Sequence, residues 1–132
     1  GTGFARIDNH FSDGLALAEK DGKWGYIDKT GKEVIACQYD NAQYFTEGFA
    51  AVKRDGKWGY IDTTGKEVIP CQYDNINWEW GYSGFSEGRA CMEKDGKCGY
   101  IDTTGKVVIP FVFDEAESFS EGLAFVRIEE AE

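Results

Sequence analysis

The chain has 132 residues, of which 15% are aromatic and 29% charged, and its formal net charge at pH 7 is -10. This length predicts one domain with a substantial hydrophobic core, and the aromatic content excludes a disordered chain. The acidic balance disfavours nucleic acid as a partner, because phosphate binding requires clustered Lys and Arg. No stretch reaches about 20 apolar residues, so the sequence predicts no membrane-spanning helix.

One eight-residue segment gives the chain its internal order. Asp-Gly-Lys-Trp-Gly-Tyr-Ile-Asp stands at residues 21–28 and 55–62, and it returns at 95–102 with Cys98 in place of the tryptophan. A Phe-Ser/Thr-Asp/Glu-Gly step precedes each copy and occurs a fourth time, beginning at Phe11, Phe45, Phe85 and Phe119. Such recurrence is typical of a tandem-repeat architecture. We interpret residues 1–132 as one repeat domain, with units at about 11–44, 45–84 and 85–118 and a partial unit at 119–132.

The second unit shows how each unit is expected to fold. Its short runs of apolar, aromatic and β-branched residues predict strands at 49–54, 57–62 and 66–70. The Asp-Gly pair at 55–56 is typical of a type I′ turn, which needs positive φ at both positions. The Thr-Thr-Gly loop at 63–65 is typical of a G1-bulge closure with a left-handed glycine. The sequence therefore predicts an all-β fold made of three-stranded antiparallel meanders.

The two turns also predict a register for the three strands. Regular pairing places Val52 opposite Gly59 and Ala51 opposite Tyr60. On the third strand it places Val68 beside Tyr60 and Pro70 beside Trp58. Side chains alternate along a strand, so both faces of the sheet are expected to be apolar. One face is predicted to hold Ala50, Val52, Gly59, Ile61 and Ile69, and the other Phe49, Ala51, Trp58, Tyr60, Val68 and Pro70. Each sheet should therefore be sandwiched between neighbours. On the central strand, Gly59 is expected to leave room for Val and Ile side chains from either side.

The rest of each unit connects it to the next one. An aspartate follows the third strand, and we expect it to cap a turn by accepting backbone N–H groups, at Asp40, Asp74 and Asp114. The Phe-x-Glu-Gly step is then expected to turn the chain sharply into the next strand. We predict that the units form a short superhelical stack. The alternative is a closed or propeller-like ring, for example one in which residues 4–8 pair with the last strand.

The repeat is interrupted in the second of the three connections between units. Six extra residues fall within 75–84, a segment that contains Trp78, Trp80 and Tyr82. With this alternate spacing, the three rings share one side of the segment if it is extended. Large aromatic side chains dominate protein interfaces and also stack on sugars, so this loop is the predicted binding surface. The alternative is that the rings pack into the gap that Cys98 leaves in place of a tryptophan.

These motifs resemble the bacterial WG repeat, also called the KWG repeat. The resemblance rests on Gly-Lys-Trp-Gly-Tyr-Ile-Asp, on Thr-Gly-Lys-x-Val-Ile-Pro and on the Tyr-Asp that follows, and it covers about residues 11–128. The repeated positions that we interpret as structural are Trp24, Gly25, Tyr26, Trp58, Gly59, Tyr60, Gly99 and Tyr100. The resemblance implies an interaction or scaffold role in a bacterium, without catalytic residues. Cys98 and the insertion depart from the family pattern.

Catalytic and metal chemistry have little support in the sequence. There is no Ser-His-Asp set, and the single histidine is His10. Most acidic residues fall in predicted turns, which leaves no evident carboxylate pair for glycosidase chemistry, and no run matches a calcium-binding loop. The four cysteines form no C-x-x-C pair, so small buried thiols are expected in preference to a zinc site. We therefore predict no enzyme and no cofactor.

Three functions fit these features. The first is a non-catalytic module that binds a protein or another ligand, and the alternatives are a carbohydrate-binding module and a purely structural spacer. Aligned lysines at positions 23, 57 and 97 offer a ladder toward a periodic partner, although protection of strand edges is the simpler interpretation. The sequence does not choose between a secreted or cell-surface and a cytoplasmic location, and it leaves the oligomeric state open.

Overall fold

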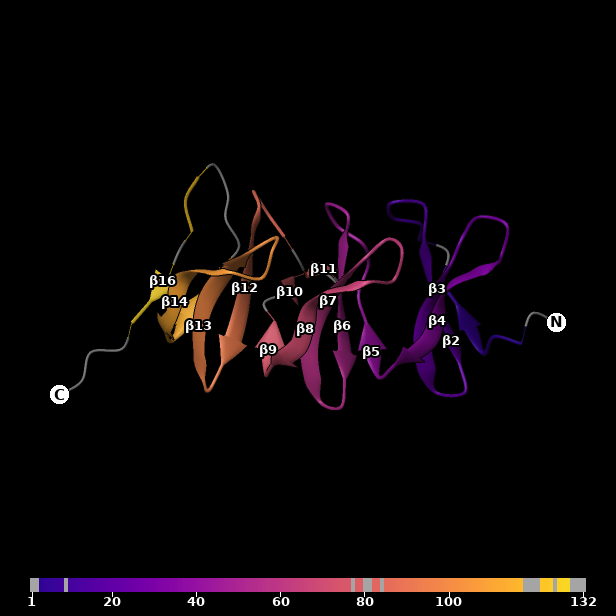
Figure 1. Ribbon diagram of the computed structural model, residues 1–132, viewed down its shortest axis with the longest axis horizontal. Coiled ribbons are helices and arrows are strands. Elements are labelled where there is room, and N and C mark those ends of the chain that lie inside the picture. The colour runs from indigo at the N-terminus through magenta and orange to yellow at the C-terminus, as the bar shows by residue number, and fades with distance from the viewer. Residues whose placement is uncertain are drawn as a thin grey trace.

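The computed structural model describes residues 3–8, 10–76, 78–79, 82–83, 85–117, 122–124 and 126–128. All regular elements in this part of the chain are β-strands, and it contains no helix of the length and apolarity needed to cross a membrane. Three four-stranded antiparallel sheets follow one another along the long axis of the molecule, from the N-terminal to the C-terminal end (Figure 1). The predicted all-β tandem architecture is confirmed.

The strands of the described residues fall into five sheets. The first sheet contains β1 (Arg6–Ile7), β2 (Ala16–Lys20), β3 (Lys23–Ile27) and β4 (Glu33–Tyr39). The second sheet contains β5 (Asn41–Ala42), β6 (Phe49–Arg54), β7 (Lys57–Asp62) and β8 (Glu67–Tyr73). The third sheet contains β9 (Asn75–Ile76), β12 (Arg89–Lys94), β13 (Lys97–Asp102) and β14 (Val107–Phe113). Two short pairs complete the set, namely β10 (Trp78–Glu79) with β11 (Tyr82–Ser83), and β15 (Glu115–Ala116) with β16 (Val126–Arg127).

The two-residue turns form as predicted. In the second sheet Asp55 and Gly56 have φ values of 52° and 81°, which is the positive-φ pair that a type I′ turn requires. Arg54 pairs with Lys57, so β6 closes directly onto β7. The Asp-Gly pairs at 21–22 and 95–96 also have positive φ at both positions, and all three sheets therefore share this hairpin.

One aspartate holds the loop between the second and third long strands. The N–H of Gly65 donates to the carbonyl of Asp62 at 3.0 Å, and Gly65 has a φ of 89°, as the predicted closure requires. The carboxylate of Asp62 accepts from the N–H of Thr64 at 2.9 Å and from its hydroxyl at 2.6 Å. The equivalent loops have the same bonds, from Thr30 to Asp28 and from Thr104 to Asp102.

Each large sheet has four strands and not the predicted three. In the second sheet the additional strand is β5, whose Asn41 and Ala42 pair with Lys53 and Val52 of β6. These residues fall in a predicted connecting segment, because two residues are too few to show an alternating pattern. β1 and β9 are the equivalent short strands of the first and third sheets.

The predicted register is correct between β6 and β7 but wrong between β7 and β8. Tyr60 pairs with Ile69, and Trp58 pairs with Tyr73, with irregularities on both sides of Tyr60. The predicted partners were Val68 and Pro70. Ile69 consequently packs with Tyr60 in one cluster and not, as predicted, on the opposite face with Val52.

Gly59 shows why the pairing is irregular. A Cβ at this position would lie 2.4 Å from the carbonyl oxygen of Ile69 and 2.7 Å from the carbonyl carbon of Pro70. Strand β8 therefore passes directly over Gly59, an approach that only a residue without a side chain allows. Our interpretation that this glycine leaves room for Val and Ile side chains is wrong, because backbone atoms occupy the space.

Neighbouring sheets cover each other's apolar faces, as predicted. The cluster between the first and second sheets consists of Leu15, Leu17, Tyr26, Ile35, Tyr39, Ala42, Phe45, Ala50, Val52 and Ile61. The cluster between the second and third sheets consists of Ala51, Trp58, Tyr60, Ile69, Tyr73, Ile76, Phe85, Ala90, Met92 and Ile101. Adjacent residues of β6 thus enter different clusters, and the second sheet is buried on both faces.

The row of sheets has two ends and, in the part of the chain that the structure describes, forms no closed ring (Figure 1). The ring alternative is therefore wrong. The segment at 4–8 does not pair with the last strand, because its β1 pairs with β2 of the first sheet. At this end Phe4 packs against a buried cluster on the outer face of the first sheet, formed by Ala16, Ala18 and Ile27.

Candidate functional site

The predicted binding loop lies outside the repeated sheets. Strands β10 and β11 form a hairpin in which Trp78 pairs with Ser83 and Glu79 with Tyr82. This β10–β11 hairpin is inserted between β9 and β12, two strands that pair directly with each other in the third sheet. The equivalent strands of the second sheet, β5 and β6, follow each other without an intervening strand.

The hairpin changes the geometry that was predicted for the three aromatic residues. That prediction placed Trp78, Trp80 and Tyr82 on one side of an extended segment, but the chain reverses direction between Glu79 and Tyr82. The premise of the prediction is therefore wrong. Trp80 and the side chains of Trp78 and Tyr82 lie outside the described residues, so binding by these rings stays a prediction.

Tryptophans fill the first two inter-sheet interfaces at the same position of β3 and β7. Trp58 is 7% exposed and belongs to one cluster with Ile76 and Met92 of the third sheet. Trp24 is half-buried and packs against the cluster between the first and second sheets. Both tryptophans thus pack at an interface between neighbouring sheets.

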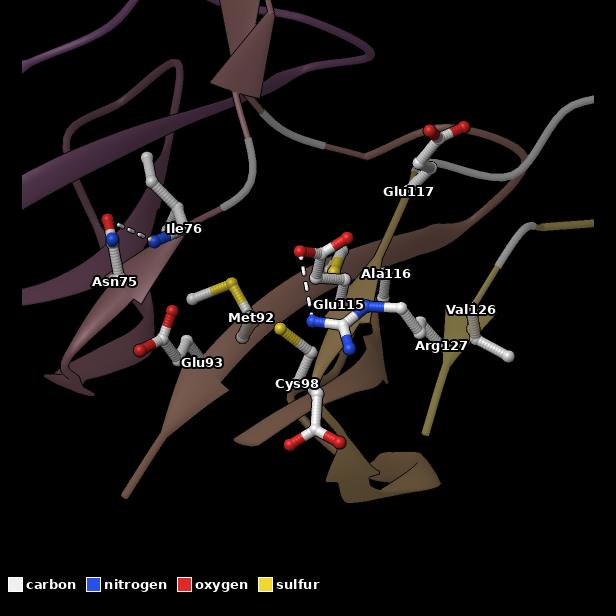
Figure 2. Close-up of a pocket in the computed structure, with 12 residues that line it drawn as sticks. Asn75, Ile76, Met92, Glu93, Cys98, Glu115, Ala116, Glu117, Val126 and Arg127 are labelled. Carbon is white, nitrogen blue, oxygen red and sulfur yellow. Dashed lines mark hydrogen bonds and ion pairs between the residues drawn. The ribbon is translucent and has the colours of Figure 1, made fainter. Parts of the chain in front are cut away.

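The third interface lies between the third sheet and the β15–β16 pair, and it has Cys98 at the tryptophan position. In the repeat, Ala116 and Val126 correspond to Ile76 and Met92. Val126 is 44% exposed, whereas Met92 is completely buried. A cavity of about 480 Å³ occupies this interface, and we call it the Cys98 cavity (Figure 2).

Two walls enclose the Cys98 cavity. One wall belongs to the third sheet, where Glu93 of β12 pairs with Asn75 on one side and Cys98 on the other, so that the three residues share a face. The opposite wall comes from β15 and β16 and includes Ala116 and Arg127. Figure 2 shows the side chains of Cys98 and Arg127 directed into the space between the two walls.

Negative charge predominates around the cavity. Its lining contains one guanidinium, that of Arg127, and four carboxylates, those of Glu93, Asp114, Glu115 and Glu117. Arg127 pairs with Glu115 at 3.1 Å, and Asp114 pairs with Lys97. Within the described part of the chain, the carboxylates of Glu93 and Glu117 have no ion-pair partner. The local potential therefore favours a cationic ligand.

Burial keeps the thiols of the cavity protonated. Desolvation raises the pKa of Cys91 to about 12, and it also raises the pKa of Cys98. Both groups are therefore neutral near pH 7, and they supply a polarisable apolar surface and not a nucleophile. All four cysteines are free thiols, and no group of three or more His, Cys, Asp or Glu among the described residues is arranged to hold a metal ion.

The lysines of the predicted ladder are paired with the connecting aspartates. The pairs are Lys23 with Asp40, Lys57 with Asp74, and Lys97 with Asp114. The other carboxylate oxygen of Asp40 accepts the N–H of Asp55 at 3.0 Å, and that of Asp74 accepts the N–H of Asp95 at 2.8 Å. The turn-capping prediction is thus confirmed for both aspartates, and the capped turn belongs to the following sheet.

One protein family matches the chain in four successive segments. The family is described as "WG containing repeat", and it matches residues 6–24, 24–58, 58–98 and 99–130. The chain belongs to the WG repeat family. The second WG repeat runs from one tryptophan position to the next, so it contains the last two strands of one sheet and the first two of the following sheet. The fourth WG repeat contains β15 and β16, which form one wall of the Cys98 cavity. No curated protein matches the chain.

Proposed function

We propose that this WG repeat chain is a non-catalytic bacterial binding module and that the β10–β11 hairpin is its contact surface. One observation supports the proposal most directly. The hairpin is inserted between β9 and β12, which pair with each other, so the strand order of the third sheet does not depend on it. We further propose that the tandem sheets wind into a short superhelix, which gives the hairpin a rigid support.

The aromatic composition of the hairpin suits this role. Trp and Tyr are the residues that contribute most binding energy at protein interfaces, and this segment contains Trp78, Trp80 and Tyr82. The other two connections between units lack this combination. Contact with a partner protein is therefore the main candidate, and stacking on a sugar is the alternative.

Two of the repeated tyrosines, Tyr26 and Tyr100, support a structural and not a catalytic role for the shared motif. The hydroxyl of Tyr26 donates to the carbonyl of Gln43 at 2.6 Å, and that of Tyr100 donates to the carbonyl of Glu117 at 2.5 Å. Each bond ties a central strand to the connection that follows it. Desolvation raises the pKa of Tyr100 to about 12, so its hydroxyl stays protonated near neutral pH.

A shortened variant tests the proposal. Deletion of residues 78–83 gives the third unit a connection as long as the one between Asp40 and Phe45, so the sheet is expected to fold. Peptides selected on the intact chain from a random phage-displayed library should lose at least about tenfold in affinity for this variant and for the W78A/W80A variant. Phe11→Ala, which removes a partly exposed aromatic ring elsewhere, is the matched control.

The same variants separate the alternatives. Undiminished peptide binding by a folded deletion variant contradicts the proposal. Glycan-array binding that is lost in W78A/W80A favours a carbohydrate-binding module instead. A chain that binds neither peptides nor glycans is a structural spacer.

A further inference from the structure

We propose that the Cys98 cavity is a binding site for a small aromatic amine, in which a planar ring of indole size carries a cationic arm. The cavity lies at the C-terminal end of the row of sheets. The proposal goes beyond the binding role of the β10–β11 hairpin and does not rest on it.

The repeat itself indicates the shape of the ligand. β15 contacts β13, as β9 contacts β7 and β5 contacts β3, so the strands at all three interfaces have the same neighbours. In the first two interfaces an indole ring, from Trp24 or Trp58, packs at the repeat position that Cys98 occupies in the third. The third interface keeps the strands, replaces the ring by the small thiol of Cys98, and contains the cavity. A flat aromatic group therefore matches the space that the repeat provides.

The size and surface of the cavity agree with this assignment. Its volume of about 480 Å³ lies within the range of roughly 300–1,000 Å³ that is usual for small-molecule sites. Neutral thiols on one wall and Ala116 and Val126 on the other provide apolar contacts. Sulfur makes favourable contacts with aromatic rings, so Cys91 and Cys98 suit a ring between the walls.

The charges around the cavity indicate the cationic arm. Glu93 lies on the third-sheet wall and Glu117 follows β15 on the opposite wall. Neither carboxylate has an ion-pair partner in the described part of the chain, so both are available to an ammonium group. The guanidinium of Arg127 is already paired with Glu115, and its flat face is suited to stack on an aromatic ring.

Calorimetric titration of the intact chain with three indoles tests the proposal. Tryptamine carries an ammonium arm, indole carries no charge, and indole-3-acetate carries a carboxylate. We expect saturable binding of one tryptamine per chain, weaker binding of indole and the weakest binding of indole-3-acetate. Equal affinity for tryptamine and indole-3-acetate, or no saturable tryptamine binding up to millimolar concentration, overturns the proposal.

Variants of the cavity locate the bound ring. Cys98→Trp restores the side chain found in the other interfaces and should lower tryptamine affinity at least about tenfold, because it fills the cavity. Cys98→Ala keeps the space open and removes only the sulfur contact, so it should lower tryptamine affinity much less than Cys98→Trp does. If Cys98→Trp does not fold, Ala116→Ile narrows the cavity from the opposite wall with the side chain that stands at position 76. Full tryptamine affinity in either filled variant overturns the proposal.

Variants of the rim locate the cationic arm. Glu93→Gln combined with Glu117→Gln should weaken tryptamine binding by about fivefold and leave indole binding unchanged, because partly exposed charge contacts contribute modestly. An equal loss for both compounds contradicts a charge contact. The variant without residues 78–83 should retain tryptamine binding, and this result separates the cavity from the hairpin.

Discussion

The second and third inter-sheet interfaces are built from equivalent strands but are filled differently. In the second interface Trp58, Ile76 and Met92 are all buried. In the third, Cys98 and Ala116 are half-buried, Val126 is exposed, and a cavity remains. The third interface keeps the same strand arrangement without the indole ring of a tryptophan. Hairpin turns, bulges and the short connecting strands produce this arrangement. Side-chain filling and backbone architecture are therefore separable in this repeat.

The second and third sheets also differ on their last strands, β8 and β14. Glu67 of β8 pairs with Arg54 at 2.8 Å, and its carboxylate accepts the N–H of Cys71 at 3.0 Å. Val107 of β14 stands at the equivalent position and is 45% exposed. The third sheet thus lacks one ion pair and one backbone cap that the second sheet has, on the face where Val107 pairs with Ile101 and which meets the second sheet.

The strongest way to break the comparison is to give the second interface the residue of the third. Trp58→Cys should destabilise the chain by about 3 kcal/mol, because it removes a buried ring from a packed cluster. Trp24→Cys is the comparison variant, and it should lower the free energy of unfolding by less, since Trp24 is only half-buried. Urea unfolding followed by circular dichroism measures both. Equal losses at the two positions contradict the packing argument.

Gly59 and Gly99, at the same position of β7 and β13, allow the backbones of the second and third sheets to be compared. Gly59→Ala should cost about 2–3 kcal/mol, because its Cβ would meet the Ile69 carbonyl at 2.4 Å. Gly99→Ala should cost less, because the nearest atom, the Ile109 carbonyl oxygen, is 2.8 Å away and the third interface is less filled. Thermal unfolding of the two variants gives the ranking. A larger loss for Gly99→Ala would show that the third sheet is the more tightly packed.

Filling the cavity is the reciprocal experiment. Cys98→Trp should stabilise the chain by about 1 kcal/mol, because it buries additional apolar surface against Ala116 and Val126. The melting temperature is the measurement, and Cys71→Trp serves as a control at a half-buried thiol that does not occupy the repeated tryptophan position. No gain for Cys98→Trp indicates that the two walls do not close on an indole.

The loop aspartates, which are alike in all three sheets, should give the smallest effect. A hydrogen bond from the hydroxyl of Thr64 lowers the pKa of Asp62, and Thr30 and Thr104 act in the same way on Asp28 and Asp102. Because the folded-state pKa lies below the unfolded value of about 4, this stabilisation is present above that pH and is lost as the pH falls through the folded pKa. Replacing the three aspartates by Asn should flatten the acid limb of the stability profile. An unchanged acid limb argues against the loop bonds as its source.

The long strands and the turns between them could be predicted, because each is specified by residues that are close together in the sequence. Asp-Gly turns, Thr-Gly bulges and apolar alternation define the long strands, and two apolar faces imply stacked sheets. The register of β8 was not predictable, because the close passage of its backbone over Gly59 depends on atoms of a neighbouring strand. The short strands were missed for a similar reason, since Asn41 and Ala42 are extended only through their pairing with β6.

The candidate sites were only partly predictable. Composition identified the insertion that forms the β10–β11 hairpin, but pairing between Glu79 and Tyr82 reverses a segment that was expected to be extended. The sequence showed that Cys98 replaces the repeated tryptophan, and this replacement predicted a gap in the packing. That this gap lies among carboxylates from two walls follows only from the approach of β15 and β16 to the third sheet.

The aspartates that join successive sheets have a consequence for how the molecule melts. Asp40 bonds Lys23 of the sheet before it and the Asp55 turn of the sheet after it, and Asp74 links Lys57 and Asp95 in the same way. Local unfolding of one sheet therefore removes bonds from both neighbouring sheets, so the stability of each sheet is coupled to that of its nearest neighbours. Amide hydrogen exchange should consequently be slowest in the second sheet and faster in the first and third sheets.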